Sequence, residues 1–366
     1  MTRNPKRILA DACRIILALT FVFSGFTKTI DPWGTAIKIT EYLNSFGFET
    51  LNQYRFGFSI WLCGAELMMG CMLLFKVRTP LISIFSLATM SFFTLLTFYM
   101  AGWGTVEDCG CFGDAVKLTA WETFFKNLVL WPLSFYVWWD ARKGRIWPIS
   151  RREYITTLLI MCFAFGLGAY CYRHLPLIDF LPFKKGVNIY ERMYRGGEHD
   201  DITLVYRDRT SGELRNFGIG DTEWYDTVRW EYVDRIEGKT DDDDVALREF
   251  AVFAGEDDVT ESIITDPGTV YMISAVRLDG VRPWCAERLA ALADRAQKNG
   301  DRGVCLTASP LGEGEDSVRF ADGPEIPVYN VDATTLVTML RAKAGVVVLQ
   351  GGVILDKLNC RDIRKK

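Results

Sequence analysis

The sequence predicts an α-helical membrane bundle of five spans, followed by a soluble α+β region. Long apolar runs are confined to residues 8–173, whereas most acidic residues lie in residues 184–366. The average values conceal this division, since 49% hydrophobic residues and a mean hydropathy of +0.08 describe two unlike halves together. The net charge of -4 therefore belongs to the second half. No basic stripe interleaved with aromatic residues occurs, which argues against nucleic acid as a partner.

Five segments are long and apolar enough to cross a bilayer, which takes about 20 helical residues. They are residues 8–27, 56–75, 80–100, 121–139 and 154–172. Arg3, Lys6 and Arg7 precede the first segment as in a signal peptide, but no small-residue cleavage pattern follows, so we expect it to be retained. Asp11 and Arg14 lie one turn apart near its inner end, where we expect their charges to pair.

Positive charge in the short loops predicts the orientation, because Lys and Arg favour the cytoplasmic side. The N-terminal segment and the loops after the second and fourth spans carry ten Lys and Arg residues, whereas the other two loops carry four. This places the N-terminus in the cytoplasm, and residues 28–55, 101–120 and 184–366 outside it. Trp and Tyr cluster at the span ends as in an aromatic belt: Trp103, Trp121, Trp138, Trp139, Tyr154, Tyr170 and Tyr172.

The outer loop 101–120 contains Cys109-Gly110-Cys111-Phe112-Gly113, in which two cysteines flank one glycine. Disulfides persist on the oxidising side of a membrane. A bridge between the two cysteines would stabilise the chain by only ~1.6 kcal/mol, because the loop it closes is so short. Three uses of the pair are consistent with the sequence: disulfide exchange, separate structural bridges, or two soft metal ligands. A metal would need further ligands, and the only histidines are His174 and His199.

Charges near the cysteine pair act in opposite senses. Glu107 and Asp108 would raise a thiol pKa, whereas Lys126, early in the fourth span, would lower it. Glu66 lies inside the second span, where a carboxylate is either a functional group or a hydrogen-bonded link between helices. Cys63, one turn earlier, either receives electrons from the pair or packs. The chain has no CxxC motif, which a quinone-reducing disulfide generator would normally carry as a second dithiol, so we expect no cofactor.

Three short motifs mark the membrane half. The first closes the first span, the second lies inside the second span, and the third joins the outer loop to the fourth span. They are Phe23-Ser24-Gly25-Phe26-Thr27-Lys28 with Asp31-Pro32, Gly64-Ala65-Glu66-Leu67 with Gly70, and Cys109-Gly110-Cys111-Phe112-Gly113 with Lys126-Asn127.

These motifs resemble those of the DoxX/MauE group of small membrane bundle proteins, namely F-x-x-x-G-x-x-K, x-E-x-x-x-G-x-x-L, and the MauE pattern C-G-C-F-G followed by a basic-Asn pair. MauE is an accessory protein of methylamine utilisation. The resemblance covers residues 8–140. It implies a four-helix core in a bacterial inner (cytoplasmic) membrane and a link to disulfide handling in the periplasm, with residues 154–173 as a fifth span. It does not imply methylamine as the substrate here.

Residues 184–260 are predicted to form a β-rich insert. Ile202–Tyr206 and the stretch after Ser211-Gly212 have the pattern of a hairpin. The aromatic residues that follow alternate as in a half-buried strand, which we interpret as core: Trp224, Tyr225, Trp230 and Tyr232. The acidic run Asp241–Asp244 is expected to be a solvated loop, because the spacing of a calcium-binding EF-hand is absent.

Residues 261–366 are predicted to alternate strands and helices. The expected strands are 269–276, 303–309 and 328–330, the helices are 283–299 and 332–342, and 346–349 and 353–355 form a closing hairpin. This order resembles the thioredoxin-like fold. Trp284-Cys285 stands where that fold carries its active cysteine, but Arg288 occupies the partner position and Ala344-Gly345 replaces the proline before the hairpin. We expect a degenerate, redox-inactive docking domain, with Cys305 and Cys360 buried or structurally paired and exchange at Cys285 as the minor alternative.

Together these features favour an integral membrane accessory protein for thiol–disulfide exchange or maturation of exported proteins. Cys109 and Cys111 would be the redox pair, Lys126 would stabilise a thiolate, and Glu66 would be the intramembrane carboxylate. The alternative is a non-enzymatic, membrane-anchored binding or assembly protein, and a weaker third reading is a small-molecule or electron-carrier partner built around Glu66. Expected partners are exported client proteins or a membrane redox partner.

Overall fold

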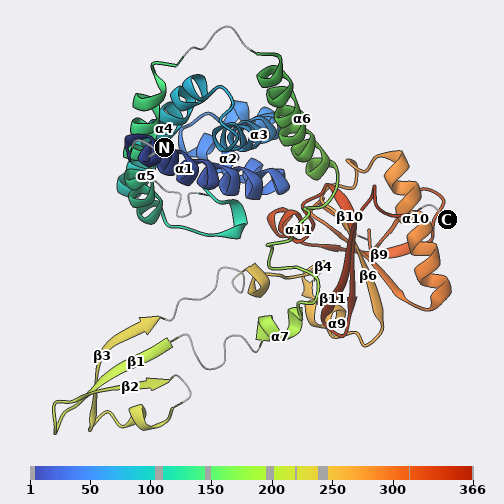
Figure 1. Ribbon diagram of the computed structural model, residues 1–366. Coiled ribbons are helices and arrows are strands. Elements are labelled where there is room, and N and C mark those ends of the chain that lie inside the picture. Colours follow the sequence, from blue (N-terminus) through green and yellow to red (C-terminus); the bar gives the residue numbers. More distant parts are fainter. Residues whose placement is uncertain are drawn as a thin grey trace. The chain divides into compact units, whose positions relative to one another are not determined.

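The computed structural model of the chain describes residues 5–103, 110–144, 150–194, 202–218, 221–237, 246–312 and 314–364. The chain divides into two compact units, Met1–Phe180 and Leu181–Lys366. Figure 1 shows the first unit as helices coloured blue to green, and the second as sheets with flanking helices coloured green to red.

The first unit consists of α1 (Pro5–Ile30), α2 (Pro32–Ser45), α3 (Arg55–Leu74), α4 (Thr79–Trp103), α5 (Ala120–Ala141) and α6 (Arg151–Arg173), with short 3-10 turns at Glu49–Tyr54 and Gly113–Ala115. Among the described residues, four helical segments are long and apolar enough to span a membrane: Pro5–Ile30, Glu49–Leu74, Thr79–Trp103 and Arg151–Arg173. The unit is therefore a multi-pass membrane bundle. Helix α5 coincides with the predicted span 121–139 and packs on α4, but its Trp residues and polar first turns lower its hydropathy.

Helices α1 and α3 pack antiparallel at very short range. A Cβ at Gly25 would lie 2.4 Å from the backbone nitrogen of Leu67, and one at Gly70 would lie 2.5 Å from that of Val22. Small residues allow membrane helices to approach this closely. One glycine from each helix therefore fixes the register of the pair.

Charged side chains tie the same two helices together at the other end. The guanidinium of Arg14 donates to the carbonyls of Leu73 and Leu74, the last residues of α3. Asp11 pairs with Arg14 at 3.5 Å and with Lys76 at 2.6 Å. The predicted Asp11–Arg14 pair is thus confirmed, and Arg14 also satisfies carbonyls that a helix end leaves without partners.

The loop predicted between the first two spans contains a helix that the sequence pattern did not reveal. Helix α2 begins after Asp31, whose side chain accepts the Gly34 N–H at 3.0 Å. Trp33 anchors it, with its ring 4.6 Å from Phe56 and 6.0 Å from Tyr172. The segment is therefore held against the start of α3 and the end of α6.

The second unit contains a small antiparallel sheet of β1 (Ile202–Asp208), β2 (Leu214–Gly218) and β3 (Trp230–Glu237), in the order β2-β1-β3. The predicted hairpin is confirmed by the pairing of β1 with β2. The expectation of one strand through Trp224 and Trp230 is wrong, because Glu223–Tyr225 is a 3-10 turn. This turn lets Trp224 stack on Tyr206 with 5.8 Å between ring centroids.

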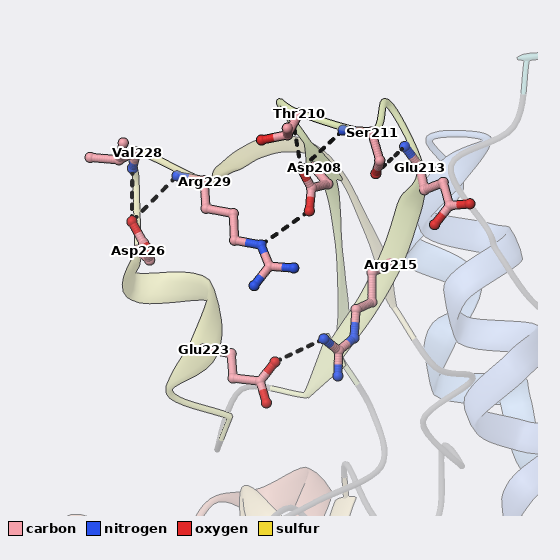
Figure 2. Close-up of polar contacts among 9 residues, drawn as sticks. All are labelled: Asp208, Thr210, Ser211, Glu213, Arg215, Glu223, Asp226, Val228 and Arg229. Carbon is pink, nitrogen blue, oxygen red and sulfur yellow. Dashed lines mark hydrogen bonds and ion pairs between the residues drawn. The ribbon is translucent and has the colours of Figure 1, made fainter.

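Asp208 organises one end of this sheet, as Figure 2 shows. Its carboxylate accepts the backbone N–H groups of Thr210 at 2.8 Å and Ser211 at 3.2 Å, which closes the turn after β1. The Nε of Arg229 donates to its other oxygen at 3.1 Å, which ties the turn to the start of β3. These donors, the Thr210 N–H foremost, hold the pKa of the Asp208 carboxyl below its usual value.

The larger sheet has the strand order β11-β10-β6-β7-β9-β4-β5, with β8 paired to β9. Its elements, with the helices around it, are α7 (Ile189–Tyr194), β4 (Phe253–Ala254), β5 (Asp257–Asp258), α9 (Thr260–Ile264), β6 (Thr269–Ala275), α10 (Pro283–Asn299), β7 (Arg302–Thr307), β8 (Ser317–Arg319), β9 (Glu325–Asn330), α11 (Ala333–Leu340), β10 (Ala344–Gln350) and β11 (Val353–Asn359). Strands β6, β7 and β9 are parallel, whereas β10 runs antiparallel to both β6 and β11. The elements predicted for residues 269–355 are all present; β4, β5, β8 and α9 were not anticipated.

Candidate functional site

A buried ion pair joins α1 to α3. The Nζ of Lys28 lies 2.8 Å from Oε2 of Glu66, and each side chain is only 8% exposed. The pair lies next to the close helix approach at Gly25. Glu66 is buried in α3, in agreement with the prediction of an intramembrane carboxylate. Its partner Lys28 was expected in the outer loop, but it lies in the last turn of α1. The terminal Lys of the first motif and the Glu of the second were the signal that could have revealed the pairing.

The turn Gly110–Gly113 lies against the last turns of α1. Both of its glycines have positive φ, +62° and +58°, which side chains with a Cβ rarely adopt. The Gly113 N–H donates to the Gly110 carbonyl at 3.1 Å, and Ser24 Oγ donates to the Cys111 carbonyl at 2.5 Å. The backbone conformation therefore favours glycine at both positions of this motif.

Three lysines from three helices contact this turn. The Lys38 stem would lie 3.1 Å from a Cβ at Gly110, and the Lys28 stem 3.9 Å from one at Gly113. The Lys126 ammonium lies 4.1 Å from the centroid of the Phe112 ring, as a cation–π contact. We call Lys28, Lys38 and Lys126 the lysine frame of the turn.

Two cysteines of this site lie near the same lysine. Cys111 and Cys63 both lie within electrostatic range of Lys28. Cys63 is 1% exposed, and its Sγ lies 3.5 Å from Thr35 Oγ1. Whether Cys63 accepts electrons or only packs stays a prediction. Cys109, together with the predicted effects of Glu107 and Asp108, lies outside the described residues.

Lys126 and Asn127 have separate contacts. Lys126 touches the turn through Phe112, so the role proposed for it near a thiolate stays a prediction. Asn127 is buried and donates to Thr97 Oγ1 at 3.4 Å, which links α5 to α4. No group of three or more His, Cys, Asp or Glu side chains suited to a metal occurs in the part of the chain that the structure describes.

The second unit contains a different cysteine site. Cys285, in the first turn of α10, forms a disulfide with Cys360, 75 residues away, and the two residues are 4% and 2% exposed. Arg288 donates to the carbonyls of Cys360 and Arg361 at 2.9 and 2.6 Å. Cys360 was predicted to be either buried or structurally paired, and it is paired. Cys305 is buried in β7, and burial raises the pKa of its thiol to about 12.

Comparison with known proteins concerns the first unit. Residues 6–140 match the family model of methylamine utilisation protein MauE. No curated protein and no solved structure matches the chain. The matched segment contains the Lys28–Glu66 pair, the cysteine-bearing turn and the Lys126-Asn127 pair. Over residues 6–140, this multi-pass membrane protein is therefore similar to the family of methylamine utilisation protein MauE.

Proposed function

We propose that this protein is an inner-membrane accessory factor that exchanges disulfides with exported proteins during their maturation, through Cys109-Gly110-Cys111. The observation that carries the proposal is the Gly110–Gly113 turn, which packs the Cys111 segment against the last turns of α1, where Lys28 is buried. A nearby cation favours the thiolate, which is the nucleophile and the leaving group of disulfide exchange.

The chemistry is a two-electron exchange. A client thiolate attacks one sulfur of an oxidised Cys109–Cys111 pair and forms a mixed disulfide, and the other sulfur leaves as a thiolate. A second client thiolate then displaces the protein sulfur. The client gains one disulfide, and the pair becomes a dithiol, which a membrane redox partner would have to reoxidise. A short, strained ring is suited to this use, since such disulfides are the exchangeable ones.

The proposed location places the N-terminus in the cytoplasm and the second unit outside it. The ten-to-four distribution of Lys and Arg between the loops supports this orientation. The Cys285–Cys360 disulfide is a second, independent support, because such bonds are rare in the cytoplasm. External protease should therefore digest residues 184–366 in cells whose outer envelope has been opened, and protection of that region would contradict the orientation.

We further propose that the larger sheet is a degenerate thioredoxin-like domain used to dock clients. Two features support it: the order β11-β10-β6-β7 with an antiparallel β10, and Cys285 in the first turn of the helix after β6. Arg288 stands where a resolving cysteine would be, and it binds the backbone that carries Cys360. The buried disulfide leaves no thiol exposed for exchange, so this domain would contribute binding and not electron transfer.

The exchange can be tested with the full-length protein in lipid nanodiscs. The oxidised protein is mixed with a reduced model peptide containing two cysteines, and peptide disulfide is quantified by mass spectrometry. We expect about one peptide disulfide per oxidised protein, and none from Cys109→Ser or Cys111→Ser. Cys162→Ser, which removes an exposed thiol of α6, is the matched control and should behave as wild type. If the oxidised wild type leaves the peptide reduced, the alternative of a non-enzymatic binding or assembly protein is favoured.

A further inference from the structure

We propose that Lys28 is the positioning residue that makes the Cys111 thiol reactive, and that Glu66 holds Lys28 in place. This inference rests on the proposed role of Cys111 in exchange. Lys28 lies in the last turn of α1, and its ammonium contacts Glu66 at 2.8 Å. Lys28 is buried, so its charge is screened far less than a charge at the surface.

The turn and Lys28 are fixed to the same stretch of helix. Ser24 binds the Cys111 carbonyl at 2.5 Å, one turn before Lys28. At Gly113, a Cβ would lie 3.7 Å from the Thr27 carbonyl oxygen and 3.9 Å from Cγ of Lys28. The turn therefore packs directly on the backbone and stem that carry the ammonium. This geometry ties the segment that carries Cys111 to the segment that carries Lys28.

The other two members of the lysine frame are less suited to this role. Lys38 pairs with Glu41 at 2.9 Å, and its side chain is 29% exposed, so solvent and the carboxylate both weaken its field. Lys126 directs its ammonium at the face of the Phe112 ring. Lys28 is the member that is buried, and its charge reaches two sulfurs.

Glu66 gives the arrangement its stability. A buried ammonium without a partner is costly, whereas a hydrogen-bonded pair offsets the loss of hydration. During exchange, Cys111 loses its proton to solvent before it attacks, or leaves as a thiolate when the ring opens. Lys28 keeps its own protons in both steps and stabilises the negative sulfur. It acts through Cys111 and needs no contact with the client.

The test measures the thiol itself, without a client. In a Cys109→Ser background, full-length protein in nanodiscs is treated with iodoacetamide across a pH series, and alkylation of Cys111 is followed by mass spectrometry. We expect Lys28→Met to slow alkylation about tenfold at neutral pH and to move the midpoint of the pH curve up by about one unit. Lys126→Met tests the other candidate thiolate stabiliser and should slow alkylation by less than about twofold, because its ammonium is directed at the Phe112 ring. Lys28→Arg keeps the charge and should restore much of the rate.

A second variant distinguishes the loss of the Lys28 charge from misfolding of the protein. Lys28→Met with Glu66→Gln removes both charges, so no unpaired charge stays buried, and we expect the same slow alkylation with an unchanged circular dichroism spectrum. Wild-type rates in both Lys28 variants, or an equal slowing by Lys126→Met, would overturn the inference. Slow alkylation in the Lys28 variants combined with a wild type that cannot oxidise the peptide would leave this inference standing and reject the proposed exchange.

Discussion

The two cysteine sites of the chain differ in what surrounds the sulfur. Cys111 is only partly buried, on a turn of two left-handed glycines among three lysines. Cys285 and Cys360 are buried together in an apolar core and are already bonded. Reactivity of a cysteine depends on thiolate charge and access, so the difference separates the site proposed for exchange from the buried, bonded pair. The number of cysteines alone could not have made this distinction.

The first prediction concerns the stabilising site and has the largest expected effect. Cys360→Ser removes a bond that closes a 75-residue loop, and the loop-entropy formula assigns about 4 kcal/mol to it. We expect the second unit of the full-length protein to be cleaved at a much lower urea concentration in pulse proteolysis. Cys162→Ser is the control. Cys305 should remain unalkylated in both folded proteins, since burial keeps its thiol protonated.

An unchanged urea midpoint for Cys360→Ser would contradict the comparison, because the second site would then not stabilise its domain. The readout does not depend on exchange activity. The urea midpoint therefore reports only whether the Cys285–Cys360 disulfide stabilises the domain, and not whether it takes part in disulfide exchange.

The second prediction concerns the close packing of α1 on α3 at the membrane site. Gly25→Ala places a methyl group 2.4 Å from the Leu67 nitrogen, so α1 and α3 must separate, at a cost of about 3 kcal/mol. We expect a lower thermal unfolding temperature in detergent and slower alkylation of Cys111, because the Lys28–Glu66 pair moves. Gly166→Ala, whose Cβ meets nothing within 4 Å, is the matched control. Equal stability of the two variants would show that the helix approach does not constrain the site.

The third and smallest effect lies in the three-stranded sheet. The folded pKa of Asp208 is lowered, so its carboxylate stabilises the sheet above the ordinary Asp pKa, and this stabilisation is lost as pH falls through the lowered value. The protection of the β1 and β3 amides against hydrogen exchange, measured relative to their intrinsic rates at each pH, should therefore fall below about pH 4. Asp208→Asn should lose this pH dependence, whereas Glu231→Gln, an exposed neighbour on β3, should keep it. Retention of the dependence in Asp208→Asn would assign it to another group.

Elements with local signals could be predicted from the sequence. Helix α10 has the predicted bounds, because Pro283 suits its first turn and Gly300 ends it with a φ of +80°. Strands β6, β7, β9, β10 and β11 of the larger sheet were recognisable as apolar runs between turn residues, whereas the short strands β4, β5 and β8 were not. Helix α2 was missed because its mixed polar and apolar residues do not differ clearly from those of a loop, and the stack of Trp33 on Tyr172 that holds it is distant in sequence.

The pairings that define both cysteine sites depend on tertiary packing. Glu66 was predicted as an interior carboxylate, but its contact with Lys28 follows from how α1 and α3 rotate and cross at their glycines. Cys285 and Cys360 are joined across 75 residues, and no local pattern encodes that choice. Cys111 and Lys28 each stand out in a sequence motif, whereas the packing of one motif against the other could not be predicted.

One consequence of the helix packing concerns motion. Helices α1 and α3 are joined by Arg14 on the α3 carbonyls and, further along, by the Lys28–Glu66 pair, so we expect them to move together. Helices α4 and α5 form a second packed pair, joined by the Asn127–Thr97 contact. The cysteine-bearing turn touches α1 through Ser24 and α5 through Lys126. Movement of α4 and α5 relative to α1 and α3 would therefore distort this turn and change the surroundings of Cys111.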